Sequence, residues 1–577
     1  MYNMIYKLQI HDRKYTSWSF LDENDQEATP LDSSFHPASS KLFHDDLLHI
    51  ENGKIIETIP GKYRSYKCAG VMLLSNAQTY GRTNNNRVLY KCIPHEPFLP
   101  ECLIPYDQRM TFSKAFVNKY VVFHFQDWTD KHPSAILHET LGNVDDLSVF
   151  YEYSLHSKQL HYSLTQTNKY LKPIVKETPY PNVLEQILQN PHYNIEDRRS
   201  QCYVFSIDPE GSTDLDDAFS FQQCEDNQDY FKLTIYISNV FLMLEALNLW
   251  EHLSERVSTI YFPDKKRTML PTILSEDWCS LLEKKDRLAF SMEVLIHQDG
   301  TLQEDSIRFF HSIIQVRKNF AYDEPKLLKN KHYQKLEHIT KLIGKEQIQD
   351  SHDVVSHWMV FMNVQAAQAL AKKQCGIFRA SSIKNKTLRN EIEKYHLDHE
   401  TQQMLCSWNN VSSSYIVFKG EAMENLQHEM MTQDCYVHIT SPIRRLVDVL
   451  NQAFFYKEIL QVHVSSASQT FIDHWSQHIE LLNQSMKSIR KVQNECQLLH
   501  QFSKNEELQD TQYKGILFHQ EQEGLFYKYQ VYLPKLKLVS TITLTHEQPL
   551  YCYYTFSAYL FEEEYNAKRK IRLQLEN

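Results

Sequence analysis

The hydrophobic and polar positions at the start of this chain predict short strands. Residues 36–95 alternate brief apolar runs with turns, for example the apolar run 69–74 and the polar turn 83–86. Residues 96–175 repeat that character. Such alternation bounded by turn residues is typical of β-structure. Residues 1–35 are polar and poorly patterned, so we expect an N-terminal extension there.

The middle and the end of the chain follow different patterns. From residue 351 onward the apolar positions recur mainly with helical spacing. Residues 513–518 and 525–534 are again short apolar runs that end at turn residues. The order predicted is therefore strands, then a mixed core that is mainly helical in its second half, then strands.

Length and composition agree with a multidomain globular protein. The chain has 577 residues, of which 42% are hydrophobic and 23% charged, which leaves room for roughly three or four domains. No apolar run approaches the roughly 18 residues that span a bilayer, and the N-terminus lacks a signal pattern. Eleven cysteines include no C-x-x-C pair, which favours reduced thiols. We expect a cytoplasmic protein.

Four aspartates lie close together in sequence, at Asp208, Asp214, Asp216 and Asp217. Packing four carboxylates together is unfavourable unless a cation neutralises them, and Mg2+ or Mn2+ prefers such oxygen ligands. A solvated acidic loop and a calcium loop are alternatives, although the calcium loop lacks a glutamate at its twelfth position, which is Phe219. A catalytic divalent-metal site is the sharper hypothesis.

A pair of arginines follows far downstream. Ser441 and Pro442 suit an N-cap and a first helical position, which would place Arg444 and Arg445 in the first turn of a helix. The helix dipole disfavours cations there, so they suggest an anion such as a phosphate. An ordinary surface pair is the alternative. The net charge of −11 argues against nucleic-acid binding over the whole surface, but not against a local basic channel.

Together the two segments resemble the RNB family of ribonuclease II, ribonuclease R and the exosome-type exoribonucleases. The acidic segment resembles the family pattern I-D-P-x-x-A-x-D-x-D-D-A, and the arginine segment resembles Y-x-H-F-T-S-P-I-R-R-Y-x-D. Further family-like segments occur between them in the same order, namely residues 259–264, 269–281 and 286–291 and an I-x-x-R-x-x-x-x-Y segment that ends at Tyr322.

The resemblance implies a multidomain α+β fold. N-terminal cold-shock-type OB β-barrels would precede a mixed α/β RNB catalytic core, and a C-terminal OB-type RNA-binding barrel would follow it. The domains expected are an N-terminal extension, a degenerate cold-shock-like OB domain, a second such domain, the RNB catalytic domain and the C-terminal OB domain, at residues 1–35, 36–95, 96–178, 180–505 and 510–577.

The resemblance also implies a function and residue roles. The protein would hydrolyse single-stranded RNA processively from 3′ to 5′, as a monomer, and release nucleoside 5′-monophosphates. The alternatives are a catalytically retired RNB protein that acts as an RNA-binding or regulatory scaffold and, more distantly, a nuclease for DNA. The site residues implied are Asp208, Asp214, Asp216 and Asp217 for Mg2+ or Mn2+, Asp216, Arg444 and Arg445 for catalysis, and Tyr261, Tyr322 and Arg444 for RNA.

Three parts of the chain depart from the family pattern, and a fourth is matched only approximately. Asn239 stands where the family commonly has an aspartate, and Leu446 replaces the tyrosine after the arginine pair. The segment that ends at Asn363 differs from the family's E-E-F-M-x-x-x-N, which makes selectivity for RNA over DNA less secure. Glu495 is the nearest match to a late helical glutamate of the family.

Overall fold

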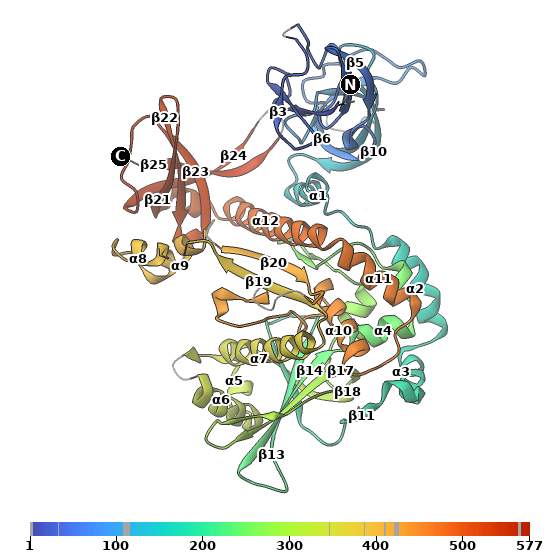
Figure 1. The fold of residues 1–577 in the computed structure, drawn as a ribbon, viewed down its shortest axis with the longest axis vertical. Helices are drawn as coiled ribbons and strands as arrows, with labels where there is room; N and C mark the ends of the chain where they lie inside the picture. Colours follow the sequence, from blue (N-terminus) through green and yellow to red (C-terminus); the bar gives the residue numbers. More distant parts are fainter. Residues whose placement is uncertain are drawn as a thin grey trace. The chain divides into compact units, whose positions relative to one another are not determined.

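The computed structural model describes residues 4–32, 34–107, 116–344, 347–385, 387–408, 411–420, 426–563 and 567–576 (Figure 1). The chain divides into two compact units. Unit 1 comprises Met1–His161, Phe262–Asp264 and Lys491–Asn577, and unit 2 comprises Tyr162–Tyr261 and Lys265–Arg490. No helix among the described residues combines the length and the apolar character that crossing a membrane requires.

Unit 1 begins with a five-stranded antiparallel sheet in the order β3-β2-β1-β4-β5. Its strands are β1 (Met4–Ile10), β2 (Trp18–Leu21), β3 (Glu27–Ala28), β4 (Leu47–Glu51) and β5 (Lys54–Ile59). Alternate residues of β1 such as Leu8 and Ile10 are buried. The segment expected to be an unpatterned extension therefore supplies three strands. Within it β1 pairs with β2 and β2 with β3, and β1 also pairs with β4 some forty residues later, a long-range pairing that local pattern does not show.

A closed barrel follows, in the order β10-β8-β7-β6-β9. Its strands are β6 (Cys68–Met72), β7 (Leu89–Pro94), β8 (Cys102–Pro105), β9 (Lys119–Asp127) and β10 (Ser134–Asn143). The barrel crosses the domain boundary expected near residue 95, because β7 and β8 pair across it. Helix α1 (Leu147–Ser157) comes next and is capped by the Asp146 side chain, which accepts from Ser148 N.

The end of unit 1 is a second five-stranded antiparallel sheet, in the order β23-β22-β21-β24-β25. Its strands are β21 (Gln512–Glu523), β22 (Phe526–Leu533), β23 (Leu538–Leu544), β24 (Tyr553–Glu562) and β25 (Arg569–Leu575), preceded by the short α13 (Glu507–Asp510). The strands predicted at the end of the sequence are thus present.

Unit 2 is built on a six-stranded mixed sheet in the order β11-β18-β12-β13-β14-β17. Its strands are β11 (Ile195–Asp197), β12 (Val204–Asp208), β13 (Asp217–Gln223), β14 (Tyr230–Ser238), β17 (Asp286–His297) and β18 (Leu302–Ala321). The first part of β18 pairs with β17 and its last six residues pair with β12. Because β12 is buried along most of its length, it reads as a continuous apolar run rather than an alternating one.

Helices and two short strand pairs complete unit 2. The strand pairs are β15 (Ile260–Tyr261) with β16 (Lys266–Arg267), and β19 (Ile377–Ile383) with β20 (Val411–Val417). The helices are α2 (Thr165–Glu177), α3 (Tyr180–Gln189), α4 (Val240–Ala246), α5 (Pro325–Leu328), α6 (Lys331–Gly344), α7 (Ser351–Lys372), α8 (Leu388–Ile392), α9 (His399–Ser407), α10 (Leu446–Glu458) and α11 (Ser466–Gln477), while α12 (Ile479–Lys504) starts in unit 2 and ends in unit 1.

Candidate active site

The four aspartates of the sequence motif lie at the adjacent ends of two central strands of the unit 2 sheet, β12 and β13. Strand β12 ends at Asp208 and its antiparallel neighbour β13 begins at Asp217, so the two carboxylates stand at adjacent strand ends. The connecting loop turns where Ser212 N donates to Pro209 O, and Gly211 takes a φ of +78° that favours glycine. The turn expected from the sequence is therefore present.

Neighbouring segments fix the backbone of this loop. The buried Ser280 hydroxyl accepts from Leu215 N at 3.0 Å and donates to Thr213 O at 2.8 Å. Ser238 N donates to Asp216 O at 2.8 Å. Because both sides of the loop are bonded to ordered backbone, its carboxylates are held in place rather than free in solvent, which excludes the solvated-loop alternative.

Three of the carboxylates lie close enough to perturb one another, with Asp216 buried and Asp208 and Asp217 half-buried. Burial, opposed by the Arg444 cation, raises the pKa of Asp216 to about 7. Burial and the Asp214 charge raise the pKa of Asp208 to about 6, and burial together with Asp208 and Asp216 raises the pKa of Asp217 well above its usual range. One oxygen each of Asp208 and Asp217 is buried and accepts no hydrogen bond from the described residues. Two such carboxylates fit a divalent cation.

Asp214 is engaged differently from Asp208 and Asp217, because both of its oxygens have partners. The Tyr261 hydroxyl donates to Asp214 Oδ2 at 2.9 Å, and Lys266 Nζ lies 2.8 Å from Asp214 Oδ1. The β15–β16 pair carries both donors. Lys266 also lies 2.9 Å from Glu276 Oε1. The chain thus supplies its own cation to one of the four aspartates, a contact that the sequence motif did not indicate.

The arginine pair does not lie in a helix as the sequence predicted. Helix α10 begins at Leu446, four residues after Pro442, and the backbone at Arg445 is extended. The reason is a long-range pairing: Thr259 N donates to Arg444 O at 3.0 Å and Leu446 N donates to Val257 O at 2.9 Å. Since residues 444–446 are paired like a strand, they cannot form the first helical turn, and the helix-dipole argument for a bound anion does not apply.

Three buried polar residues of α10 hold this part of the site together. Asp448 accepts from Ser441 N at 2.7 Å and pairs with Arg445 at 3.0 Å. Asn451 donates to His438 O at 2.9 Å, and Gln452 donates to Ser238 O at 2.9 Å. These bonds connect the arginine segment to the strand that ends beside the acidic loop, which satisfies polar groups that would otherwise destabilise the core.

Arg444 reaches the acidic loop. Its Nε donates to Asp216 Oδ2 at 3.1 Å, its Nη2 donates to Ser441 Oγ at 3.0 Å, and Ile443 N donates to Asp216 Oδ1 at 2.9 Å. Burial disfavours the charged guanidinium, but Asp216 outweighs this and raises the pKa of Arg444. The Arg444 side chain is 44% exposed, so it can meet a ligand. Arg445 instead is committed to Asp448.

The two tyrosines singled out in the sequence both lie near the acidic loop. Tyr261 is 41% exposed, so it is not a core residue. Tyr322 is half-buried, and its backbone N donates to Asp208 O at 3.1 Å. Burial, Asp217 and Asp208 raise the pKa of Tyr322. Both rings are therefore placed where a strand bound at the acidic loop could touch them.

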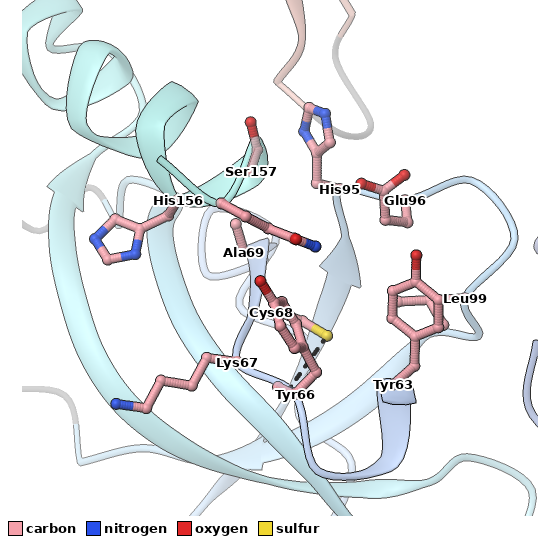
Figure 2. A pocket seen from close by; sticks show the side chains of 11 residues that line it. Tyr63, Tyr66, Lys67, Cys68, Ala69, His95, Glu96, Leu99, His156 and Ser157 are labelled. Atoms are coloured by element: carbon pink, nitrogen blue, oxygen red, sulfur yellow. Dashed lines mark hydrogen bonds between the residues drawn. The ribbon is translucent and has the colours of Figure 1, made fainter. Parts of the chain in front are cut away.

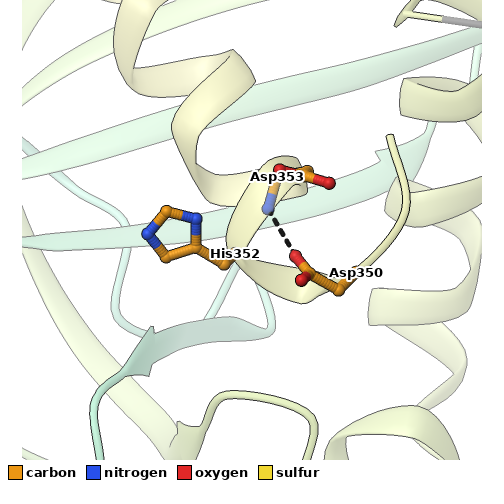
Figure 3. A group of neighbouring side chains, drawn as sticks. All are labelled: Asp350, His352 and Asp353. Carbon is orange, nitrogen blue, oxygen red and sulfur yellow. Dashed lines mark hydrogen bonds between the residues drawn. The ribbon is translucent and has the colours of Figure 1, made fainter. Parts of the chain in front are cut away.

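A second acidic group lies at the start of α7. Among the described residues, three potential metal-ligand atoms lie within 4.8 Å of one another only at Asp350, His352 and Asp353 (Figure 3). Asp350 caps the helix by accepting from Asp353 N at 2.9 Å, and two of the three residues are exposed. The loop aspartates are less tightly gathered, since Asp214 and Asp216 turn to Lys266 and Arg444.

Asn239 and Asn363, from two segments that differ from the family pattern, have structural roles. Asn239 caps α4 by accepting from Leu242 N. Asn363 accepts from Ile439 N at 3.0 Å and donates to the Tyr436 hydroxyl at 3.0 Å, which supports the arginine segment from behind. Glu495 lies in unit 1, 3.9 Å from Lys491.

A small pocket occurs in unit 1, apart from these residues in the sequence (Figure 2). It lies where the end of α1 meets the start of β6. Its lining residues are Tyr63, Tyr66, Lys67, Cys68, Ala69, His95, Glu96, Leu99, His156, Ser157 and Gln159. None of the residues predicted for the active site lines it.

Comparisons with known proteins single out the same part of the chain. The family model of the RNB domain matches residues 196–343 and 325–461, which include all eight predicted site residues. Ribonuclease R of Aquifex aeolicus is 29% identical over 187 residues, 32% of this chain and 25% of that protein. A probable exosome complex exonuclease RRP44 of Caenorhabditis elegans is 21% identical over 474 residues, 70% of this chain and 47% of that protein.

Solved structures extend the similarity to the whole fold. Mycoplasma genitalium RNase R, in complex with ribose methylated single-stranded RNA, matches with a TM-score of 0.68 at 14% identity, over 99% of this chain and 97% of that chain. Yeast Ssd1, a pseudonuclease, matches with a TM-score of 0.62 at 12% identity, over 96% of this chain and 80% of that chain. The expected multidomain α+β fold is confirmed. The chain spans less than half the length of the two curated relatives named above.

Proposed function

Because the chain belongs to the RNB family, we propose that it is a metal-dependent 3′→5′ exoribonuclease that hydrolyses single-stranded RNA processively to nucleoside 5′-monophosphates. One observation carries the proposal. Beside the adjacent ends of β12 and β13, Arg444 meets the carboxylates of Asp208, Asp216 and Asp217. That site offers both oxygen ligands for a cation and a guanidinium for a phosphate.

Asp208 and Asp217 would hold the divalent cation, Mg2+ or Mn2+, through the buried oxygens that accept no hydrogen bond from the described residues. When bound, such a cation polarises a phosphodiester and lowers the pKa of a bound water. The full set predicted from the resemblance also contains Asp214 and Asp216. Asp214 would join only after leaving Lys266, and Asp216 acts here chiefly on Arg444.

Arg444 would bind the scissile phosphate. Its planar guanidinium fits two phosphate oxygens, and a donor fixed in advance stabilises charge that develops in the transition state. Asp216 positions Arg444 by holding Nε at 3.1 Å. Arg445 would act indirectly, because its pairing with Asp448 shapes the turn that carries Arg444. Water adds to phosphorus, the 3′-oxygen of the penultimate nucleotide leaves, and a nucleoside 5′-monophosphate is released.

The two tyrosines would guide the strand. The exposed Tyr261 ring is available to stack on a base near the 3′ end, and base–aromatic stacking contributes about 1–3 kcal/mol. Tyr322 would contact the strand further along, since its backbone is bonded to that of Asp208. Stacking of this kind tolerates any base, which suits degradation without sequence preference.

A catalytically retired RNA-binding scaffold is the second candidate. It is favoured by the Lys266–Asp214 pair, in which the chain's own cation takes a predicted metal ligand, and by the similarity to a pseudonuclease. In this case the basic and aromatic groups would bind RNA without cutting it.

Internally labelled single-stranded RNA, incubated with the protein and Mg2+, separates the two candidates. Chromatography of the products is expected to show nucleoside 5′-monophosphates. Asp217→Asn should abolish them, because it removes a proposed ligand. Asp305→Asn, an exposed aspartate of β18, is the matched control and should cleave like the wild type. RNA that is bound but stays intact with the wild type would support the scaffold instead.

A further inference from the structure

A three-stranded arrangement places one more arginine beside the candidate site. In the β19–β20 pair, Arg379 stands opposite Tyr415. The other edge of β19 bonds to the segment that leads to the arginine pair, since Arg379 N donates to Tyr436 O at 2.8 Å. Asn451 of α10 fixes this register, because it bonds both Ile377 O and His438 O at 2.9 Å.

The Arg379 guanidinium lies over an aromatic ring, and no described carboxylate pairs with it. It is 4.8 Å from the centroid of the Tyr415 ring, and the residue is half-buried. Within the described part of the chain, its side-chain N–H groups have no hydrogen-bond acceptor and no carboxylate at ion-pair distance. A guanidinium has five such donors, and leaving charged donors unpaired where water is partly excluded is costly. The adjacent arginines differ, since Arg444 has Asp216 and Arg445 has Asp448.

The surroundings of Arg379 are positive. Burial lowers the pKa of Arg379, and the nearby Arg490 and Arg445 lower it further, against the opposite effect of Tyr415. Burial, Arg445 and Arg379 also lower the pKa of His438, whose Nδ1 lies 2.7 Å from the Tyr415 hydroxyl. The described residues therefore collect cations and aromatic rings here and include no anion that pairs with Arg379, as expected where a ligand brings the negative charge.

We propose that Arg379, held over Tyr415 with Arg445 nearby, binds a phosphodiester of single-stranded RNA next to the one that Arg444 would hold. The ring keeps the planar guanidinium in one orientation, which suits bidentate contact with two phosphate oxygens. The identity of the ligand rests on the proposed function. The binding itself does not require cleavage, so it is expected in an active or a retired protein.

The test is a scan of single neutralised phosphates. Short single-stranded RNAs, each with one methylphosphonate linkage at a different position from the 3′ end, are bound in EDTA and followed by fluorescence anisotropy. At one position, the methylphosphonate should weaken RNA binding by the wild type on the order of tenfold, because Arg379 no longer meets a charged phosphate there. Arg379→Gln should bind the unmodified RNA as weakly as the wild type binds this modified RNA. A methylphosphonate at the same position should not weaken its binding further. Its plot of log affinity against log salt should be shallower by about 0.7, the value of one phosphate on a single strand.

Two variants control for charge and folding. Arg317→Gln removes the same charge from an exposed position on β18 and should leave the response to that position unchanged. Arg379→Lys keeps the charge but not the planar guanidinium, so a methylphosphonate at the same position should weaken its RNA binding less than that of the wild type. If Arg379→Gln has a reduced melting temperature, Arg379→Lys replaces it in the scan.

The subsite and the proposed function fail separately. If Arg379→Gln, or the lysine variant in its place, responds to every methylphosphonate as the wild type does, the subsite is wrong even where Mg2+ supports cleavage. If a position-specific effect of Arg379 is found and the wild type never cleaves RNA in Mg2+, the subsite stands and hydrolysis does not. A wild type that does not bind single-stranded RNA contradicts both.

Discussion

Asp216 and Arg444 are 228 residues apart in the sequence and meet at 3.1 Å, where the guanidinium Nε donates to the buried carboxylate. The same carboxylate accepts from Ile443 N. Asp216 is thus occupied by the arginine segment on both oxygens, whereas Asp208 and Asp217 each keep one buried oxygen that accepts nothing from the described residues. The structure separates the four aspartates into those facing the chain's own cations and those available to a metal.

This separation predicts that Asp216 and Arg444 act as one unit. Arg444→Lys should lower turnover on the order of a hundredfold, with a smaller effect on RNA affinity, since a fixed transition-state donor is lost. Asp216→Asn should stop nearly all cleavage, and the double variant should be no worse than Asp216→Asn alone. Single-turnover kinetics with saturating RNA measure this. If the turnover of the double variant is reduced by the product of the two single-variant losses, Asp216 acts independently of Arg444, as a metal ligand.

The raised pKa values of the acidic-loop carboxylates predict that the metal-free protein loses stability as the pH rises. The folded-state pKa of Asp208 is raised to about 6, above the usual value of about 3.9 for an unfolded chain. The folded state therefore binds more protons between these values, and this group destabilises it increasingly as the pH rises toward 7. Asp208→Asn should melt at a higher temperature than the wild type in EDTA at pH 7.5, and at nearly the same temperature at pH 4.

Burial lowers the pKa of His311 to about 3 and the pKa of His438 well below its usual range. Because these histidines take up protons in this pH range only when the chain unfolds, they also change stability with pH, and the difference between variant and wild type is the quantity to compare. Mg2+ should raise the melting temperature of the wild type at pH 7.5 more than that of Asp208→Asn. A variant that is less stable than the wild type at pH 7.5 in EDTA would contradict the crowding of uncompensated carboxylates.

Lys266 predicts a restraint on metal binding. Its ammonium is 2.8 Å from Asp214 Oδ1, so Lys266→Met should free that oxygen and remove a repelling charge. Isothermal titration with Mn2+ is expected to show tighter binding, on the order of tenfold. Lys265→Met, which removes an exposed neighbouring charge, is the control and should change little. Unaltered affinity in Lys266→Met would exclude Asp214 from the metal site.

Much of the site follows from the sequence, and the remainder depends on contacts between distant segments. The aspartate spacing and the turn residues after Asp208 predict a strand that delivers carboxylates to a loop, and the structure has both. The helix expected at Pro442 begins later because residues 257–259 pair with residues 444–446. No local pattern around the arginines shows that pairing.

Other features were hidden for the same reason. Lys266 meets Asp214 because β16 pairs back on β15, and Arg379 meets Tyr415 because β19 pairs with β20. The strands near the N-terminus are short and lie in a polar segment, and β1 pairs with β4 beyond residue 46 as well as with β2, so the pattern of the first 35 residues did not show them.

Tyr261 predicts a dependence on RNA length. Because its ring is 41% exposed and its hydroxyl bonds Asp214, Tyr261→Ala should weaken binding of short oligonucleotides by about 1–3 kcal/mol and of long ones much less. Tyr261→Phe keeps the ring and should bind short RNA like the wild type. Tyr395→Ala, at a tyrosine that is 44% exposed, is the control. Equal losses for short and long RNA would argue against a stacking role.

The central claim, a metal-dependent nuclease that enters RNA from its 3′ end, is tested most directly with duplexes labelled at the 5′ end of one strand. One duplex carries a single-stranded 3′ overhang on the labelled strand, and the other carries a 5′ overhang instead. With Mg2+, the 3′ overhang should shorten stepwise toward the junction while the 5′ overhang stays intact, and EDTA should stop the reaction. Shortening that starts from the 5′ overhang, or a 3′ overhang that remains whole in Mg2+, would contradict the account.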